Sequence, residues 1–271
     1  MPLRCGLTTG SSWDRRRALR NAPGCFVAST SRLDYRPVAH LWRVLFLFLS
    51  LRVRVKVSGR HNIPSKGPLV IAANHRTFYD PVLVTAAIGL PVAWVSSVLV
   101  SEFPMARGLA KRLGAIFVDH RGRTCRGDVD RILETSRTKV IGFFPEGIEG
   151  VVHIRRRENL CHFKRGFAYT AVANEIPVLP VAIIPHDEAV VQYPFGPSVR
   201  RIFLKRSEFL RTPSRMTYSK VELRILPPVP VGRSDPARRN SDILLLRERV
   251  KDSITKALKE SLQYEDQVSS V

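Results

Sequence analysis

The sequence has few cysteines, few acidic residues and no uninterrupted long apolar run, and each shortage excludes a class of protein. Its four cysteines stand apart without a CxxC pair, which excludes a disulfide scaffold and a cysteine-based zinc site and is typical of a reducing compartment. The histidines lack metal-ligand spacing and no glycine-rich nucleotide loop is present, so we expect neither a metal nor a cofactor. A spanning helix needs about 20 apolar residues. The uncharged stretch 81–101 is long enough, but Gly89 and Pro91 interrupt it.

Acidic side chains are outnumbered by basic ones, with 23 Asp and Glu against 44 Lys and Arg in 271 residues and a net charge of +21. This surplus indicates an anionic partner, which is nucleic acid, an acidic membrane surface or a phosphorylated substrate. The chain has no zinc-finger, RNA-recognition or helix-turn-helix signature, and its aromatic residues do not alternate with the basic runs. We therefore expect no nucleic-acid partner and favour a membrane surface with anionic lipids.

The basic charge is concentrated near the N-terminus, where residues 1–60 hold 12 basic and 2 acidic side chains. Residues 1–40 are rich in Arg and Ser, which fits a disordered tail, an over-extended start of a bacterial chain, or a transit peptide for plastid or mitochondrial import. Residues 41–56 combine an apolar stretch with arginines that can reach lipid headgroups, so they lie on a membrane or form an ordinary packing helix. We expect a membrane-associated protein on the cytoplasmic face, with its main domain in residues 57–271.

The rest of the chain alternates between strand-like and helix-like segments. Short apolar runs predict buried strands at 68–73, 92–96, 115–118, 139–144 and 178–183, and a half-exposed strand at 221–226. Helical spacing predicts helices at 81–88, 105–113, 128–138 and 166–175, and an amphipathic C-terminal helix through residues 243–257. This order predicts an α/β domain with a mixed, mostly parallel central sheet flanked by helices.

The most informative segment, Asn74–Pro81, directly follows the first of these strands. His75 stands at the carboxyl end of that strand, where open α/β sheets place their ligands. Asp80 stands about one turn further on and can accept the imidazole N–H, which leaves the other ring nitrogen as a general base. With no serine nearby, such a pair suits direct attack by a hydroxyl group of the substrate. The alternative is a helix-capping aspartate beside a structural histidine.

Three further motifs follow in order, and together the four resemble the glycerolipid acyltransferase family, which includes the 1-acylglycerol-3-phosphate acyltransferases. The motifs are NHxxxxD at Asn74–Asp80, a glycine, apolar strand and arginine at Gly114–Arg121, FPEG at Phe144–Gly147, and an apolar-proline run at Ile176–Pro180. The resemblance covers roughly residues 57–230. It implies transfer of a fatty acyl group from acyl-CoA or acyl carrier protein to the hydroxyl of a lysophospholipid such as 1-acylglycerol-3-phosphate, in phospholipid biosynthesis.

The same resemblance assigns roles to individual residues. His75 would deprotonate the acceptor hydroxyl and Asp80 would orient and stabilise His75, with no covalent acyl-enzyme and no metal. Glu146 and Gly147 resemble residues at the family's acceptor site. A phosphate on the acceptor would need cations to hold it. Our candidates for that contact are Arg121, Lys164 and Arg165.

The chain departs from the family pattern at two positions. The family usually has arginine where the simplest alignment places His120, and Arg121 comes one position later. After FPEG the family usually has Thr-Arg, whereas this chain has Ile148-Glu149. The acceptor is therefore a glycerol phosphate, another lysolipid or a different lipid alcohol. The loop Arg155–Arg157 supplies the missing charge, faces the membrane, or is a solvated basic loop. A catalytically silent lipid-binding relative is disfavoured because the NHxxxxD motif is intact.

Overall fold

The computed structural model describes residues 44–45, 47, 51–97, 104–118, 126–153, 155, 158–192 and 214–269. The predicted tail 1–40, most of the apolar stretch 41–50 and the candidate residue Arg121 lie outside these ranges. No helix among the described residues is long and apolar enough to cross a membrane.

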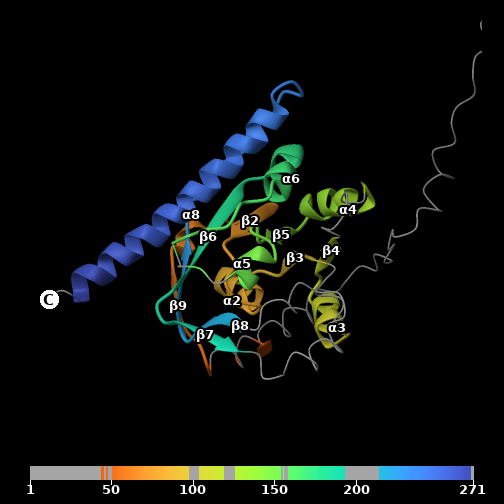
Figure 1. The fold of residues 1–271 in the computed structure, drawn as a ribbon. Helices are drawn as coiled ribbons and strands as arrows, with labels where there is room; N and C mark the ends of the chain where they lie inside the picture. Colours follow the sequence, from red (N-terminus) through yellow and green to blue (C-terminus); the bar gives the residue numbers. More distant parts are fainter. Residues whose placement is uncertain are drawn as a thin grey trace, which may run out of the picture. The chain divides into compact units, whose positions relative to one another are not determined.

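The centre of the domain is a seven-stranded sheet in the order β1-β9-β6-β2-β5-β3-β4 (Figure 1). Its strands are β1 (Arg54–Ser58), β2 (Leu69–Ala73), β3 (Val92–Ser97), β4 (Ile116–Val118), β5 (Val140–Phe143), β6 (Val178–Pro185) and β9 (Lys220–Ile225). Every neighbouring pair is parallel except β6 and β9, which are antiparallel. The predicted mixed, mostly parallel sheet is therefore confirmed.

Helices cover both faces of this sheet because its central strands are apolar on both sides. The helices are α2 (Asp80–Ile88), α3 (Pro104–Arg112), α4 (Arg126–Ser136), α5 (Glu149–Val152), α6 (Gly166–Asn174) and α8 (Arg239–Ser269), with a short 3-10 helix η1 (Arg60–Asn62). Successive side chains of a strand point to opposite faces. Leu69, Ile71 and Ala73 of β2 therefore pack with α2, whereas Val70 and Ala72 pack in the core under α4, α6 and α8.

The predicted break after residue 88 is also present. Helix α2 ends at Ile88, and Gly89 adopts a left-handed conformation with φ of 75°, which glycine reaches at little cost. Strand β3 then begins at Val92. The described part of the uncharged stretch, residues 81–97, therefore forms a helix and a strand of the core, as expected.

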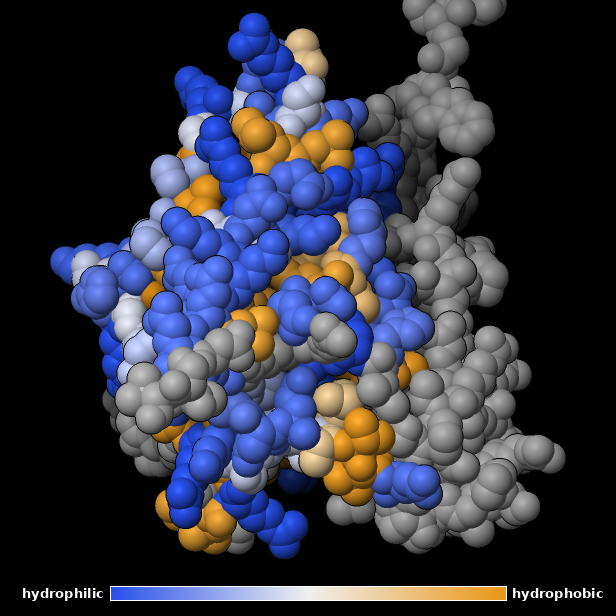
Figure 2. All heavy atoms as spheres, turned by 60° about the vertical axis from the view of Figure 1, so that its left-hand side comes forward, coloured by the Kyte–Doolittle hydropathy of each residue, from blue (hydrophilic) through white to orange (hydrophobic). Residues whose placement is uncertain are grey.

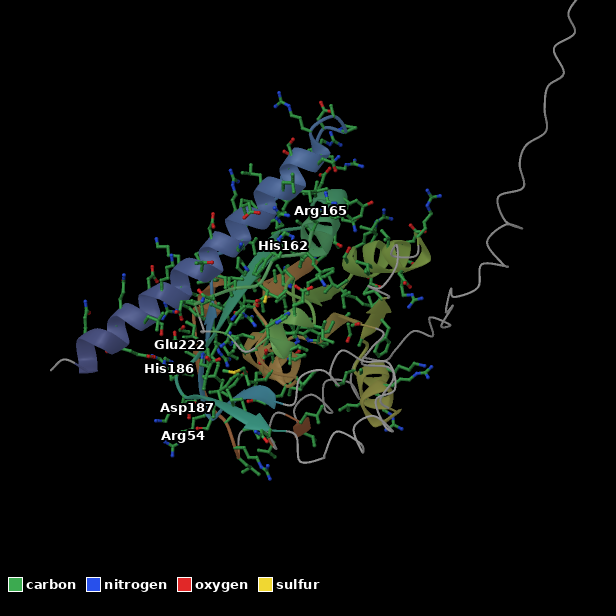
Figure 3. All side chains as sticks on the ribbon, viewed as in Figure 1. Arg54, His162, Arg165, His186, Asp187 and Glu222 are labelled. Carbon is green, nitrogen blue, oxygen red and sulfur yellow. The ribbon has the colours of Figure 1, made fainter. Side chains whose placement is uncertain are left out.

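Strand β9 differs from the prediction. Its alternating residues predict a half-exposed strand, but Glu222 is only 6% exposed. Burial of this carboxylate is tolerated because it accepts hydrogen bonds from Ser58 at 2.8 Å and Arg224 at 3.0 Å. The side chain of His186 also lies near it, and His186 is paired with Glu265 of α8. Figure 3 shows His186 and Glu222 close to the C-terminal part of α8, which explains the burial.

The long helix α8 lies along β6 and has two chemically different faces. Apolar residues along its inner side are buried against the sheet: Ile243, Leu246, Val250, Ile254, Ala257 and Leu258. Figure 2 shows a mostly hydrophilic surface on the side of the domain that carries α8. The predicted amphipathic helix is therefore present and extends further toward the C-terminus than residue 257.

Three strands were not expected from the sequence. Strand β1 at Arg54–Ser58 starts inside the segment that we assigned to the membrane surface. It was not predicted because its basic residues obscure the alternation of apolar side chains. Strands β7 (Glu188–Gln192) and β8 (Ser214–Tyr218) form a separate antiparallel pair. They are short and β7 is largely exposed, so neither carries a strong apolar pattern.

Candidate active site

His75 and Asp80 are in direct contact at the carboxyl end of β2. The Nδ1 atom of His75 lies 2.8 Å from Oδ2 of Asp80. Asp80 is the first residue of α2, and Pro81 after it favours the start of a helix there. The imidazole is 14% exposed, and within the described part of the chain no hydrogen bond engages its Nε2 atom. The pair thus leaves one ring nitrogen accessible for proton transfer.

The carboxylate of Asp80 is fully buried and receives five hydrogen bonds. Its Oδ2 atom accepts from His75 and from the backbone N–H groups of Arg76 at 2.6 Å and Thr77 at 2.9 Å. Its Oδ1 atom accepts from the Thr77 hydroxyl at 2.6 Å and from the Tyr218 hydroxyl. Burial favours the neutral acid, but the hydrogen bonds and charge of His75 outweigh it, so the pKa of Asp80 lies below its ordinary value. Asp80 is therefore ionised beside the imidazole.

A stack of three rings fixes the plane of the imidazole. His75 stacks on Phe144 with ring centroids 4.0 Å apart, and Phe144 stacks on Trp94 with centroids 4.4 Å apart. The indole N–H of Trp94 donates to the Thr85 hydroxyl at 2.9 Å. Because Trp94 comes from β3 and Thr85 from α2, the stack ties the ring of His75 to two rigid elements.

Glu146 and Arg155 hold the backbone of His75. The Oε1 atom of Glu146 accepts the His75 N–H at 2.9 Å, and Oε2 accepts the N–H of Cys161 at 2.6 Å and the guanidinium of Arg155. Glu146 is completely buried and Arg155 is 11% exposed. Arg155 also donates to the carbonyl oxygen of His75 at 3.3 Å. Both oxygens of Glu146 are thus engaged within the protein, and Arg155 is not a solvated loop residue. Arg156 and Arg157 lie outside the described residues.

Arg76 links the same loop to the β7–β8 pair. Its side chain is buried and its Nε atom lies 2.7 Å from Oε1 of Glu188 in β7. The guanidinium also donates to the Arg155 carbonyl oxygen at 3.0 Å. Buried Arg76 and partly buried Arg155 therefore connect the β2–α2 loop, the segment after β5, and the β7–β8 pair.

Gly150 allows α5 to lie directly against His75. A Cβ atom at position 150 would be 2.8 Å from both Cβ and the carbonyl oxygen of His75. We expect Gly150→Ala to displace His75 and to lower kcat for the activity proposed below by about 10- to 100-fold, because small misplacements of a reacting group are costly. Steady-state kinetics on the purified variant checks this. Gly108→Ala is the control, because a Cβ there meets nothing within 4 Å and it too lies in a helix. Equal kcat for both variants would contradict the expectation.

Two of the remaining predicted substrate-binding residues, Gly147 and Lys164, lie together beside α5, whereas Arg121 lies outside the described residues. Gly147 has φ of 62°, and a Cβ there would lie 3.0 Å from Nζ of Lys164. That Nζ atom is 3.6 Å from Oε1 of Glu149, and both side chains are more than 40% exposed. Arg165 is exposed at the start of α6 near His162 (Figure 3). Lys164 and Gly147 are thus in contact, and Glu149, which replaces a basic residue of the family pattern, partly neutralises Lys164.

Four residues of the site were not predicted from the sequence: Arg76, Thr77, Glu188 and Tyr218. Thr77 and Arg76 stand inside the NHxxxxD motif, so their position was a usable signal. Tyr218 and Glu188 belong to strands that were not predicted, and no local pattern marks them. Among the described residues, no group of three His, Cys, Asp or Glu side chains is arranged to hold a metal ion.

The fold and the site together define an α/β domain with a His-Asp pair at the carboxyl edge of a mostly parallel sheet. Residues 54–184 match the family model described as "Acyltransferase". The match covers about half of the chain, includes His75 and Asp80, and supports the predicted assignment to the acyltransferase family.

Individual relatives agree with this assignment. The chain is 25% identical over 217 residues to sheep (Ovis aries) 1-acyl-sn-glycerol-3-phosphate acyltransferase alpha, covering 77% of this chain and 64% of that protein. It is 26% identical over 133 residues to the 1-acyl-sn-glycerol-3-phosphate acyltransferase of Borreliella burgdorferi, covering 48% of this chain and 51% of that one. The chain therefore spans less than two thirds of the length of these relatives.

A solved structure supports the fold independently. The 1-acyl-sn-glycerophosphate (LPA) acyltransferase PlsC from Thermotoga maritima superposes with a TM-score of 0.54 at 21% identity. The match covers 82% of this chain and 78% of that chain. At this identity the likeness concerns the fold.

Proposed function

We propose that this protein is an O-acyltransferase that moves a fatty acyl group from an acyl thioester to the hydroxyl of a lysophospholipid. The thioester is acyl-CoA or acyl carrier protein, and 1-acylglycerol-3-phosphate is the first acceptor to test. The observation that carries the proposal is the contact between His75 and the buried, ionised Asp80, which leaves Nε2 of His75 without a hydrogen-bond partner among the described residues.

In the proposed reaction, Nε2 of His75 takes the proton of the acceptor hydroxyl while Asp80 stabilises the imidazolium. The acceptor oxygen attacks the thioester carbonyl, a C–O bond forms and the C–S bond breaks. The proton on His75 then passes to the departing thiolate. Cys161 does not offer a covalent route, because burial raises the pKa of its thiol and keeps it protonated. The acyl group therefore passes directly from donor to acceptor.

The protein has cations suited to an acidic acceptor. Lys164 lies against Gly147 and is paired with Glu149, which stands two residues further along the chain. The next residue, Gly150, packs against His75. We assign Lys164 to the acceptor phosphate, with Gly147 giving the phosphate access to the backbone. Glu146 then acts by holding the loop rather than by touching the acceptor, since both of its oxygens are engaged. Arg165 and Arg121 complete the proposed set of cations.

Lys164→Met should raise KM for 1-acylglycerol-3-phosphate about tenfold and leave kcat nearly unchanged, because a charge that contacts the phosphate binds ground state and transition state alike. Glu149→Gln should lower the same KM, since it removes the carboxylate that competes for Lys164. Initial rates at several acceptor concentrations measure both. If the two variants shift KM in the same direction, Lys164 does not bind the acceptor phosphate.

The function itself is tested with full-length protein in detergent micelles or in vesicles containing anionic lipid. Radiolabelled acyl-CoA and acyl carrier protein are offered with a panel of lysophospholipids and with a neutral lipid alcohol. We expect a labelled phospholipid to form, with lysophosphatidic acid among the accepted acceptors. Absence of transfer to every acceptor, together with tight and salt-sensitive binding to DNA, would replace the proposal by a nucleic-acid-binding function.

A further inference from the structure

Asp80 has a hydrogen-bond partner that comes from outside the segment matched by the family model. That segment ends at residue 184, whereas Tyr218 is the last residue of β8. The Tyr218 hydroxyl donates to Oδ1 of Asp80, and Tyr218 is 3% exposed. The Thr77 hydroxyl donates to the same oxygen at 2.6 Å. Oδ1 of Asp80 is thus held by two hydroxyl groups, while Oδ2 faces His75.

The phenol of Tyr218 acts as a donor in this contact. Burial, and next the negative charge of Asp80, raise the pKa of Tyr218 well above its ordinary value, so the hydroxyl keeps its proton. A carboxylate accepts only, and its hydrogen bonds from protonated groups are among the stronger ones in proteins. The direction of the bond therefore follows from the chemistry of both partners.

The β7–β8 pair holds Tyr218 in this position through two other contacts. Arg76, next to His75, is paired with Glu188 of β7. Tyr79, next to Asp80, accepts the backbone N–H of Tyr218 at 3.2 Å and packs edge-on against its ring with centroids 5.1 Å apart. The β7–β8 pair is thereby attached to the NHxxxxD motif at two positions, Arg76 and Tyr79.

We propose that Tyr218 is a positioning residue that fixes the Asp80 carboxylate and tunes the basicity of His75 for the acyl transfer proposed above. Among the described residues, the Tyr218 hydroxyl bonds Asp80 and lies 3.4 Å from the Thr77 hydroxyl but does not bond the imidazole, so we assign its effect on His75 to the Asp80 carboxylate. Each hydrogen bond that Asp80 accepts from another donor weakens the stabilisation that its negative charge gives to the imidazolium of His75. Removing the phenol donor therefore makes His75 easier to protonate. Among the described residues, the other charged groups near His75 are Glu146 and Arg155, which bind its backbone, and Arg76, whose guanidinium is paired with Glu188; all remain unchanged in the variant.

The test is Tyr218→Phe, which keeps the ring and removes the hydroxyl. We expect the acid limb of the pH profile of kcat/KM to move to higher pH by about half a unit to one unit, because His75 must lose its proton to act as a base. Tyr169→Phe is the matched control, since Tyr169 is an exposed residue of α6 and is not among the donors to Asp80. It should leave the limb in place. A purely structural role would lower kcat/KM equally at every pH.

A second measurement does not depend on turnover. The imidazole of His75, assigned by its loss in His75→Gln, is titrated by nitrogen NMR in the wild type and in Tyr218→Phe, and its pKa should rise in the variant. Fluorotyrosine at position 218 is a stronger donor and should lower it. An unchanged titration in both variants would overturn the proposal. Absence of acyl transfer by the wild type would instead sink the proposed function and leave the NMR comparison valid.

Discussion

Replacing His75 by alanine should reduce kcat for acyl transfer by about a hundred- to ten-thousandfold, the range that proton transfer by a positioned base typically contributes. Within the described part of the chain, the nearest carboxylates cannot replace it. Asp80 is buried behind the imidazole, and both oxygens of Glu146 accept hydrogen bonds from the protein. The loss should appear in kcat more than in KM, since His75 is proposed to act only on the reacting hydroxyl.

The matched control for this variant is His61→Ala, an exposed histidine in η1 that makes no contact with the site. Its activity should equal that of the wild type. Thermal unfolding of His75→Ala should show a folded protein, because the imidazole is partly exposed and its backbone contacts remain. Acyl transfer that survives in folded His75→Ala at more than one tenth of the wild-type rate would eliminate the mechanism.

Arg155→Met should lower the free energy of unfolding by about 3 to 5 kcal/mol, the range seen when one partner of a buried ion pair is removed. The reason is that Glu146 is completely buried and would lose its cationic partner. The variant should also lose activity, because Arg155 binds the carbonyl oxygens around His75. Its backbone acceptors other than His75 are Gly150 at 2.6 Å, His153 at 3.2 Å and Asn159 at 2.6 Å. Urea unfolding followed by circular dichroism measures the stability.

Two further variants separate the ion pair from a general effect of losing a cation. Lys164→Met removes an ion pair that is largely exposed, and exposed pairs contribute less than about 1 kcal/mol. The double variant Arg155→Met/Glu146→Gln should be more stable than the sum of the single losses predicts, because the two residues interact directly. Equal losses for Arg155→Met and Lys164→Met would show that the buried pair has no special weight.

The sequence was sufficient to predict the central sheet and the contact between His75 and Asp80. Buried parallel strands are short apolar runs bounded by turn residues, and such runs mark β2, β5 and β6 clearly. His75 and Asp80 are only five positions apart, so one motif places both at the end of β2. The two departures from the family pattern also located Glu149, which the structure pairs with Lys164.

The residues that support the His75–Asp80 pair could not be predicted from the sequence, because they are far from the residues they contact along the chain. Tyr218 is 138 positions from Asp80, and Glu188 is 112 positions from Arg76. Arg155 stands in a basic run, and such runs are typical of solvated loops. Only its ion pair with buried Glu146 shows that it has a structural role. Tertiary packing determines how exposed a long polar side chain is and which partner it contacts. Patterns in a single sequence do not show this.

The hydrogen bonds to Asp80 join residues that are synthesised at different times. His75 and Asp80 leave the ribosome together, but the donor on β8 follows 138 residues later. At a typical elongation rate of about 5 to 20 residues per second, that interval lasts roughly 7 to 30 seconds. During this time the growing chain already carries the NHxxxxD motif without its full set of hydrogen bonds. The full set of hydrogen bonds to Asp80 therefore depends on the synthesis of β8.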